Sequence, residues 1–556
     1  MNFGKYKRQY FDVPITDREW TDRIIAKAPI WCSVDLRDGN QALYSPLSTE
    51  EKTEYFKFLV DMGFKEIEVG FPAASDTEYE FVRKLIDEKI IPDDVTIQVL
   101  TQAREHIIDK TIEAVKGAEN VIIHLYNSTS MIQRRVVFGK SREEILQLAV
   151  DGAKMICERT AGMSGNIRYE YSPESFTCTE SDFAAEVCNA VLEVFKPDKE
   201  HKAIINLPAT IEVSTPNVYA DQVEYVNKNL KYRENVILSV HAHNDRGTGI
   251  AATELGILAG ADRVEGTVFG NGERTGNADI ITVALNMFCQ GIDPCLKLDS
   301  IDGIIDVYEK YIRMPIGPRQ PYAGDMAYVA FSGSHQDAIR KSLAEFEANG
   351  SKTWENPYLT IDPGDIGRKY EPIKINSQSG KGGLAYIMEK KYDLVIPKGL
   401  LADFSGHITA LSERKHSVLE PAEIHSVFID SYVNITEPYR LNNYKCEADG
   451  TDTIIHALVG SREISASGNG PLDALCEAIK LITNEDVEIF EYSEHALERS
   501  STSKAVSYIA VKTAKGISWG VGVDSNIIKT AYLYASDYTA IVMPIHLPER
   551  DCIFIA

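Results

Sequence analysis

The chain has 556 residues, of which 44% are hydrophobic and 25% are charged. This length is too great for a single hydrophobic core, so two to four domains are expected, and the composition is ordinary for a globular protein. The formal net charge of −24 argues against nucleic acid or an anionic membrane surface as a partner. It does not exclude an anionic substrate, because a local cluster of cations can hold one.

The cysteines and the N-terminal segment indicate a reducing compartment. Nine cysteines are scattered without a C-x-x-C pair, so neither a zinc ribbon nor a disulfide framework is indicated. No apolar run reaches the length of a membrane span, and the first ten residues lack the apolar core of a signal peptide. We therefore predict a cytoplasmic protein.

From residue 30 to about residue 290 the chain alternates short β-rich runs with longer amphipathic patterns. Eight alternating units match a (β/α)8 TIM barrel in number and length. A doubly wound open sheet is the structural alternative, but the turn after the first run is not a glycine-rich dinucleotide turn. The eight predicted strands are Ile30–Leu36, Glu66–Phe71, Thr96–Thr101, Val121–Tyr126, Ile167–Tyr171, Ala203–Leu207, Val236–Val240 and Arg263–Phe269.

The pattern changes on either side of the barrel. Residues 1–29 are predicted to be an N-terminal extension, residues 30–300 the catalytic barrel, and residues 301–426 a mainly helical linker and lid. Strands and helices return over 427–556, where Ile464–Asp473 and Ile517–Asn526 each run from a strand through a glycine turn into a helix. Two copies of one such unit predict a small pseudo-symmetric α+β domain.

The most informative stretch is His241-Ala-His243, at the end of the apolar run Val236–Val240. Alternate residues of a strand share a face, so the two imidazoles point the same way and could form half of a metal site. A pair of hydrogen-bonded core histidines is the alternative. The ends of the other strands bear on this choice, because a TIM barrel gathers its chemistry at the carboxyl ends of its strands.

Polar side chains of metal-binding and acid–base types do follow the predicted strands. Asp38, the two histidines and the amide oxygen of Asn277 form a mixed nitrogen–oxygen set that suits Mg²⁺, Mn²⁺ or Zn²⁺ with open positions for substrate oxygens. Without a thiolate, the choice among these metals stays open. Each residue alone has a structural alternative, such as a buried Arg37–Asp38 ion pair, but their convergence favours a site.

Three motifs, Leu36–Gln41, His241–Asp245 and Gly270–Asn277, resemble those of the metal-dependent Claisen-type acyltransferases and aldol lyases built on a TIM barrel. This family includes isopropylmalate, homocitrate and citramalate synthases and hydroxymethylglutaryl-CoA lyase. The similarity extends from about residue 8 into the C-terminal domain, although residues 536–556 match poorly. It is strongest to the 2-isopropylmalate synthases, over residues 31–42, 101–104, 124–130, 206–210, 332–337 and 376–383.

The resemblance implies that acetyl-CoA, 3-methyl-2-oxobutanoate and water give 2-isopropylmalate and CoA, the first committed step of leucine biosynthesis. It implies a divalent metal, with K⁺ as a possible activator. The implied protein ligands are Asp38, His241 and His243, with Asn277 close or directly bound.

The resemblance also assigns the proton chemistry. Arg37 would stabilise developing oxyanion charge, and Glu174 and His335 are candidates for the proton-transfer pair. His335 and Tyr370 would belong to a lid that covers the active site of a partner subunit, which implies a homodimer. A helix cap is the structural alternative for His335.

Substrate contacts follow from the same resemblance. Apolar and small neutral groups suit a branched alkyl tail, whereas a 2-oxoglutarate site, as in homocitrate synthase, would need a second cation, for which Arg104 is the nearby candidate. Citramalate synthase and a carbon–carbon lyase are further alternatives, and the retained catalytic residue types disfavour a non-catalytic relative. The implied contacts are Leu100, Ser172, Asn206 and Pro208 around the isopropyl group, Thr210 at the carboxylate, and His124.

The C-terminal domain resembles the leucine-sensing domain of the family. Its predicted turns at Gly468–Pro471 and Gly520–Gly522 would each precede a helix, and their backbone N–H groups could hold an amino-acid carboxylate. Tight turns in a structural dimerisation domain are the alternative. Feedback inhibition by leucine is therefore a hypothesis.

Overall fold

The computed structural model describes residues 5, 8–350, 353–368, 373–377, 379–435, 441–449, 452–484, 486–497 and 504–524. The chain divides into two compact units, residues 1–327 with 361–369, and residues 328–360 with 370–556. Among the helices described, none is both long enough and apolar enough to span a bilayer.

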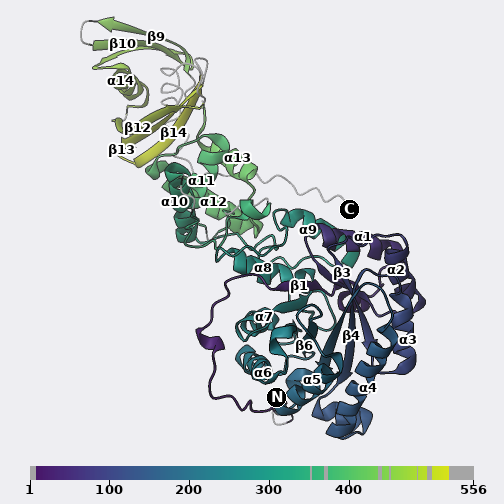
Figure 1. The fold of residues 1–556 in the computed structure, drawn as a ribbon. Helices are drawn as coiled ribbons and strands as arrows, with labels where there is room; N and C mark the ends of the chain where they lie inside the picture. The colour runs from purple at the N-terminus through teal and green to yellow at the C-terminus, as the bar shows by residue number, and fades with distance from the viewer. Residues whose placement is uncertain are drawn as a thin grey trace. The chain divides into compact units, whose positions relative to one another are not determined.

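Eight parallel strands close into a barrel in the first unit, in chain order around the ring, with β8 pairing back to β1 (Figure 1). This confirms the predicted TIM barrel. The strands are β1 (Ile30–Ser33), β2 (Glu66–Gly70), β3 (Thr96–Gln102), β4 (Asn120–Ser128), β5 (Asn166–Glu174), β6 (Ala203–Ala209), β7 (Val236–Ala242) and β8 (Arg263–Gly266).

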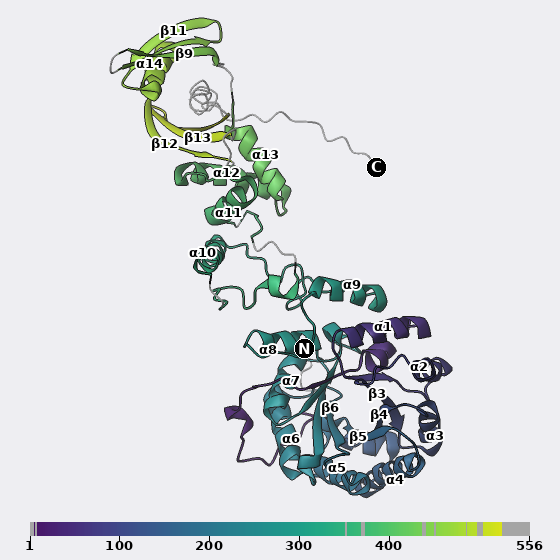
Figure 2. The same ribbon diagram turned by 45° about the horizontal axis from the view of Figure 1, so that its top comes forward.

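The barrel helices alternate with the strands and cover their outer faces (Figure 2). Strands β2, β6 and β7 are buried along their whole length, as parallel strands covered by helices are expected to be. The helices are α1 (Thr49–Asp61), α2 (Asp76–Asp87), α3 (Glu105–Ala114), α4 (Arg142–Thr160), α5 (Ser181–Phe195), α6 (Pro216–Asn229), α7 (Gly249–Leu258) and α8 (Ile280–Phe288), followed by α9 (Ile301–Ile312).

The first and eighth strands are shorter than predicted. β1 ends at Ser33 and residues Asp35–Gly39 form a π-helical turn, while β8 ends at Gly266 and is followed by a 3₁₀ turn. The backbone carbonyl of Val34 accepts a hydrogen bond from the Gly39 N–H at 3.1 Å. The chain therefore forms a helical turn where the sequence predicted an extended strand. Such π-helical turns are frequent at functional sites, and this one carries Arg37 and Asp38.

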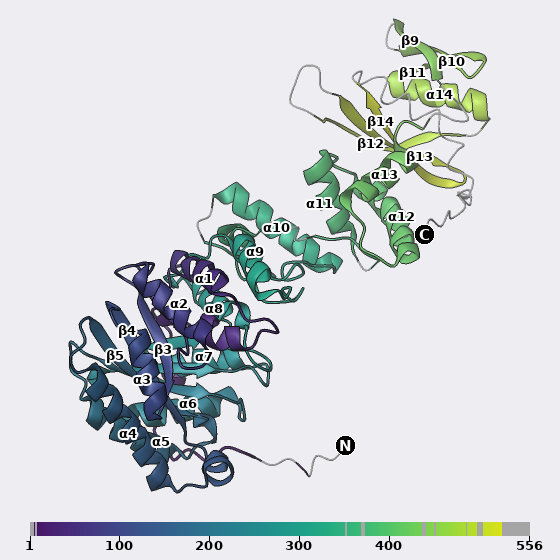
Figure 3. The same ribbon diagram turned by 90° about the vertical axis from the view of Figure 1, so that its right-hand side faces the viewer.

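The second unit combines helices with two three-stranded antiparallel sheets, ordered β11-β10-β9 and β12-β13-β14 (Figure 3). This confirms the predicted helical region followed by an α+β domain. The helices are α10 (Gly333–Asn349), α11 (Lys381–Tyr392), α12 (Lys398–Lys415), α13 (Pro421–Tyr432) and α14 (Pro471–Thr483). The strands are β9 (Leu441–Asp449), β10 (Asp452–Val459), β11 (Arg462–Gly468), β12 (Glu488–Ala496), β13 (Ala505–Thr513) and β14 (Gly516–Asp524).

Strand β13 joins the two cores of this unit, because its alternate side chains face opposite sides of the sheet. Val506, Tyr508 and Ala510 belong to a core that contains buried residues of α11, α12 and α13. Ile509 and Val511 belong to a second core with α14 and β10. The sheet β12-β13-β14 therefore has buried residues on both of its faces.

The predicted internal repeat is correct in its first copy and wrong in its second. β11 runs through a glycine turn into α14, as expected. Gly520 and Gly522 lie inside β14 instead of in a turn, because Gly520 and Gly522 pair with Ile509 and Ser507 of β13. The helix predicted to follow lies outside the described residues.

Candidate active site at the mouth of the barrel

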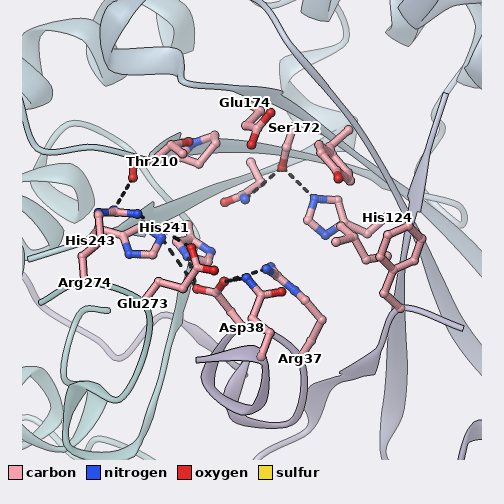
Figure 4. A pocket seen from close by; sticks show the side chains of 16 residues that line it. Arg37, Asp38, His124, Ser172, Glu174, Thr210, His241, His243, Glu273 and Arg274 are labelled. Carbon is pink, nitrogen blue, oxygen red and sulfur yellow. Dashed lines mark hydrogen bonds and ion pairs between the residues drawn. The ribbon is translucent and has the colours of Figure 1, made fainter. Parts of the chain in front are cut away.

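A cavity of about 300 Å³ lies among the strand ends and loops at the carboxyl end of the barrel (Figure 4). Every predicted site residue carried by the barrel lines it, except Asn277, which is buried beside it. The lining residues are Arg37, Asp38, Gln41, Phe71, Leu100, His124, Tyr126, Ser172, Glu174, Asn206, Pro208, Thr210, His241, His243, Glu273 and Arg274.

Asp38, His241 and His243 bring their donor atoms together on one side of this cavity. Asp38 Oδ2 lies 3.5 Å from His241 Nε2 and 3.6 Å from His243 Nε2. Figure 4 shows Asp38 between Arg37 and the histidine pair, with Glu174 and Ser172 across the cavity. The π-helical turn thus carries the carboxylate, and β7 and its first following residues carry the two imidazoles.

Asn277 reaches this cluster because its loop turns back on itself. Its side-chain Oδ1 lies 2.9 Å from His241 Nε2, and its backbone N–H donates to the Gly270 carbonyl. Gly276 has a φ of +92°, and a Cβ there would lie 1.9 Å from the Gly270 carbonyl oxygen. Only glycine fits this position without displacing Asn277.

Burial and neighbouring charges separate the protonation states of the three donors. Burial alone would raise the pKa of Asp38, but Arg37 and the histidines outweigh it and hold that pKa well below its usual range. Burial would lower the pKa of His241, but the neighbouring carboxylates of Asp38 and Glu265 outweigh it and raise that pKa to about 9. Burial and the adjacent charge of His241 lower the pKa of His243 to about 4.

The cluster fits a divalent cation. All three ligand atoms lie within 4.8 Å of one another on buried residues. Asp38 Oδ2, the oxygen that lies near both imidazoles, is buried and has no hydrogen-bond partner in the part of the chain that the structure describes. Buried polar atoms are rarely left so, unless a ligand or an ion satisfies them. One carboxylate and two imidazoles form a set that Zn²⁺ or a harder divalent ion can accept.

Arg37 is held between two carboxylates. Its Nη1 donates to Asp38 Oδ1 at 2.9 Å, and its Nε donates to Glu68. The guanidinium is therefore positioned beside the candidate ligand Asp38, where it can stabilise negative charge on a nearby oxygen.

His124 forms the opposite wall of the cavity. Its Nδ1 lies 2.8 Å from Glu68 Oε1, and its Nε2 lies 2.7 Å from Ser172 Oγ. Asn206 Nδ2 donates to the same Ser172 hydroxyl at 3.0 Å. Three predicted substrate contacts are thus connected by hydrogen bonds.

Glu174 and Thr210 lie on the rim of the cavity, at the ends of β5 and β6. The Ser128 hydroxyl donates to the Glu174 carboxylate, and Thr210 Oγ1 accepts from the Ser175 N–H at 2.9 Å. Leu100 and Pro208 supply apolar surface to the lining. The cavity therefore combines a candidate cation site, a carboxylate on its rim and apolar surface.

Five lining residues were not predicted: Gln41, Phe71, Tyr126, Glu273 and Arg274. Gln41 Nε2 donates to Asp38 Oδ1 at 3.1 Å, and Arg274 Nη2 donates to the Thr210 carbonyl at 2.6 Å. Gln41, Glu273 and Arg274 lie inside the motifs at 36–41 and 270–277. Their place in these motifs could have identified them as site residues. Phe71 and Tyr126 carry no signal beyond their place near strand ends.

The remaining predicted residues are not brought to this cavity within the barrel unit. His335 lies outside that unit, in the first turn of α10, where its exposed ring stacks on Tyr358 at 4.1 Å between centroids. Tyr370 lies outside the described residues. Arg104 is exposed at the N-terminus of α3 and does not line the cavity.

Three family models match successive parts of the chain. The model described as HMGL-like matches residues 28–307, the one described as alpha-isopropylmalate synthase, post-catalytic domain-like, matches residues 325–389, and the LeuA allosteric (dimerisation) domain matches residues 418–537. The first match covers the whole barrel and the last covers both sheets of the second unit.

Curated relatives are similar over nearly the full length. The 2-isopropylmalate synthase of Acetoanaerobium sticklandii is 52% identical over 541 residues, which cover 96% of this chain and 95% of that protein. The 2-isopropylmalate synthase of Helicobacter hepaticus is 52% identical over 555 residues, which cover 96% of this chain and 98% of that protein.

Proposed function

Because this chain belongs to the 2-isopropylmalate synthase family, we propose that it condenses acetyl-CoA with 3-methyl-2-oxobutanoate and water to give 2-isopropylmalate and CoA. This acyl transfer is the first committed step of leucine biosynthesis. The observation that carries the proposal is the buried cluster of Asp38, His241 and His243 at the edge of a partly apolar cavity.

Asp38, His241 and His243 would hold the divalent cation, Mg²⁺, Mn²⁺ or Zn²⁺, with Asn277 close to it or bound directly. When bound, the cation would act as a Lewis acid on the keto and carboxylate oxygens of the 2-oxo acid. K⁺ would act as an activator. The buried Asp38 Oδ2, which has no hydrogen-bond partner among the described residues, supports this assignment.

The cavity walls suit a branched 2-oxo acid. Leu100 and Pro208 offer apolar contacts to an isopropyl group, and Ser172, Asn206 and His124 add small or neutral polar groups. Thr210 would bind the substrate carboxylate. Homocitrate synthase activity is disfavoured, because a distal carboxylate would need a further cation. Arg104 does not line the cavity, and Arg274, which does, is paired with Asp245.

Proton transfer is assigned to residues on the rim and in the lid. Glu174 would accept a proton from the methyl group of acetyl-CoA, with the Ser128 hydroxyl orienting its carboxylate. Arg37 would stabilise negative charge on the reacting oxygens. His335 and Tyr370 would complete the site from the lid of the partner subunit in a homodimer.

A substrate panel tests the proposal. CoA thiol release is measured with a divalent metal and acetyl-CoA, offering 3-methyl-2-oxobutanoate, pyruvate and 2-oxoglutarate in parallel. We expect the branched acid to have the highest kcat/KM, with residual turnover of pyruvate, because one methylene in an apolar pocket is worth only about 1–3 kcal/mol. Equal or greater activity with either of the other acids would overturn the assignment.

We further propose that the C-terminal domain binds leucine and inhibits the enzyme, on the strength of the LeuA match over residues 418–537. A cavity of about 810 Å³ lies beside α14, β12 and the end of β13. The backbone N–H of Asn469 already donates to Asp473 Oδ2, so that amide is not available to a ligand carboxylate.

Saturating leucine should lower the reaction rate and raise the thermal midpoint of the protein. No change in either quantity would refute regulation by leucine.

The domain division proposed with this function is an extension (1–29), a catalytic barrel (30–300), a linker and lid (301–426) and a regulatory domain (427–556). A cytoplasmic location is proposed on the nine scattered cysteines, which include no C-x-x-C pair.

A further inference from the structure

We propose that Glu265, on β8, is a positioning residue that fixes the metal ligand His241 and the pocket residue Asn206 in one hydrogen-bonded unit. The inference rests on the proposed function, because it takes His241 as a ligand of the cation. Glu265 does not line the cavity and is fully buried beneath it.

Each carboxylate oxygen of Glu265 accepts hydrogen bonds from two donors. Oε2 accepts from His241 Nδ1 at 2.8 Å and from Asn206 Nδ2 at 3.1 Å. Oε1 accepts from Gln98 Nε2 at 2.9 Å and from Arg263 Nη1 at 2.9 Å. The carboxylate therefore has no freedom to rotate without breaking contacts on both sides.

The ion pair with Arg263 makes Glu265 a carboxylate that can only accept hydrogen bonds. His241 must therefore present Nδ1–H to it, and His241 Nε2 is the nitrogen that faces Asp38 and Asn277. A carboxylate behind a ligating imidazole fixes both its ring orientation and its tautomer, and strengthens it as a ligand. Glu265 thus selects Nε2 as the nitrogen offered to the cation.

The same reasoning sets the orientation of the Asn206 amide. A carboxylate oxygen requires the NH₂ group, so Asn206 Nδ2 faces Glu265, and Asn206 Oδ1 is left buried without a hydrogen-bond partner in the described part of the chain. Ser172 Oγ accepts from the same NH₂ group. One carboxylate therefore couples the cation ligand to the wall that would contact the substrate.

Glu265 could instead serve only as a counter-ion for Arg263, and Glu66 offers a matched comparison. Glu66 is also buried and accepts from Arg263 Nε at 2.6 Å, but its other partner is Arg168. It contacts neither a proposed ligand nor a lining residue in the described structure. A counter-ion role would make the two carboxylates equivalent, whereas a positioning role would not.

The experiment compares Glu265→Gln with Glu66→Gln in the full chain. Mn²⁺ is titrated into metal-free protein and free Mn²⁺ is measured by electron paramagnetic resonance. The expected rise in the Mn²⁺ Kd is about 10–100-fold for Glu265→Gln and within about twofold for Glu66→Gln. The visible absorption of the Co²⁺-loaded protein should change only in the Glu265 variant, because only there is a ligand reoriented.

Glu265→Asp keeps the charge beside Arg263 but moves the carboxylate back by about 1.5 Å. This variant tests the positioning role if Glu265→Gln does not fold. It should weaken Mn²⁺ binding about tenfold. His241→Ala serves as the reference. If His241→Ala binds Mn²⁺ like the wild type, the proposed metal site fails; if it loses Mn²⁺ while a folded Glu265 variant binds normally, only this inference is overturned.

Discussion

Two layers of polar residues inside the barrel differ in how completely their groups are paired. The middle layer is centred on Arg263, which is fully buried and donates hydrogen bonds to Glu66, Glu265, Gln98 and Ser239. The Glu170 carboxylate beside it has no hydrogen-bond partner among the described residues, but it forms an ion pair with Arg263 at 3.5 Å. In the mouth layer, buried atoms of Asp38 and His243 are left without hydrogen-bond partners, as far as the described residues extend.

The difference separates groups that hold the fold together from groups that could bind a ligand. Leaving a buried polar atom unpaired costs roughly 1–3 kcal/mol, so the mouth layer is destabilised relative to a fully paired one. Removing one partner from a paired buried charge costs more, because the remaining charges are stranded. Substitutions in the two layers should therefore separate activity from stability.

His243→Ala should remove a candidate cation ligand from the mouth layer and leave the ion pairs of the middle layer intact. We expect kcat to fall about 10³–10⁴-fold, because a cation site that contributes several kcal/mol loses a ligand. The free energy of unfolding of the metal-free protein should fall by less than about 2 kcal/mol, since His243 Nδ1 has no hydrogen-bond partner among the described residues and mainly packing is lost. Steady-state rates and urea denaturation measure the two effects; near-wild-type turnover would remove His243 from the ligand set.

Arg263→Met should break the middle layer. We expect a loss of about 3–5 kcal/mol in the free energy of unfolding, because two buried carboxylates, Glu66 and Glu265, each lose their ion pair with Arg263. Urea denaturation measures this loss. Arg274→Met is the control at the mouth: Arg274 pairs with Asp245 but is 40% exposed, so its loss should cost less than about 1 kcal/mol. Equal losses would erase the distinction between the layers.

The mouth layer should also respond to pH through His241. Its pKa of about 9 in the metal-free protein means that a proton must leave when the cation binds. The apparent affinity for Mn²⁺ should therefore rise by up to about tenfold for each pH unit between pH 6.5 and 8.5. An affinity that does not change with pH would show that no proton leaves.

The same pKa has a consequence for stability with the opposite sign. Because the folded pKa lies above the ordinary value of 6.5, the contribution of His241 to the metal-free protein is complete below about pH 6.5. It is lost as the pH rises through about 9. Thermal unfolding after chelation should show this loss, whereas the metal-loaded protein should not.

Leu100→Ala gives the smallest expected effect and tests the apolar wall. Leu100 is buried at 7% exposure and lines the cavity. Enlarging the wall should favour a 2-oxo acid that is one methylene longer over 3-methyl-2-oxobutanoate by about tenfold in kcat/KM, or about 1–2 kcal/mol. Unchanged selectivity would place the alkyl tail elsewhere in the cavity.

Sequence reasoning found the mouth residues because a parallel barrel brings the ends of all its strands together. Asp38, His124, Glu174 and His241 could be read from strand ends before any contact was known. Glu265 was not found, because its partner nearby in the sequence, Arg263, suggests only an ion pair. The hydrogen bonds that define its proposed role reach His241 and Asn206, 24 and 59 residues away.

Periodicity of apolar residues and the types of side chain at strand ends determined the barrel, the α+β domain and the chemical class of the mouth. Tertiary structure alone decided three further features: the π-helical turn that carries Asp38, the glycine-dependent return of Asn277, and the nitrogen that His241 presents. Each depends on hydrogen bonds between distant strands and loops, and local propensity contains no information about such partners.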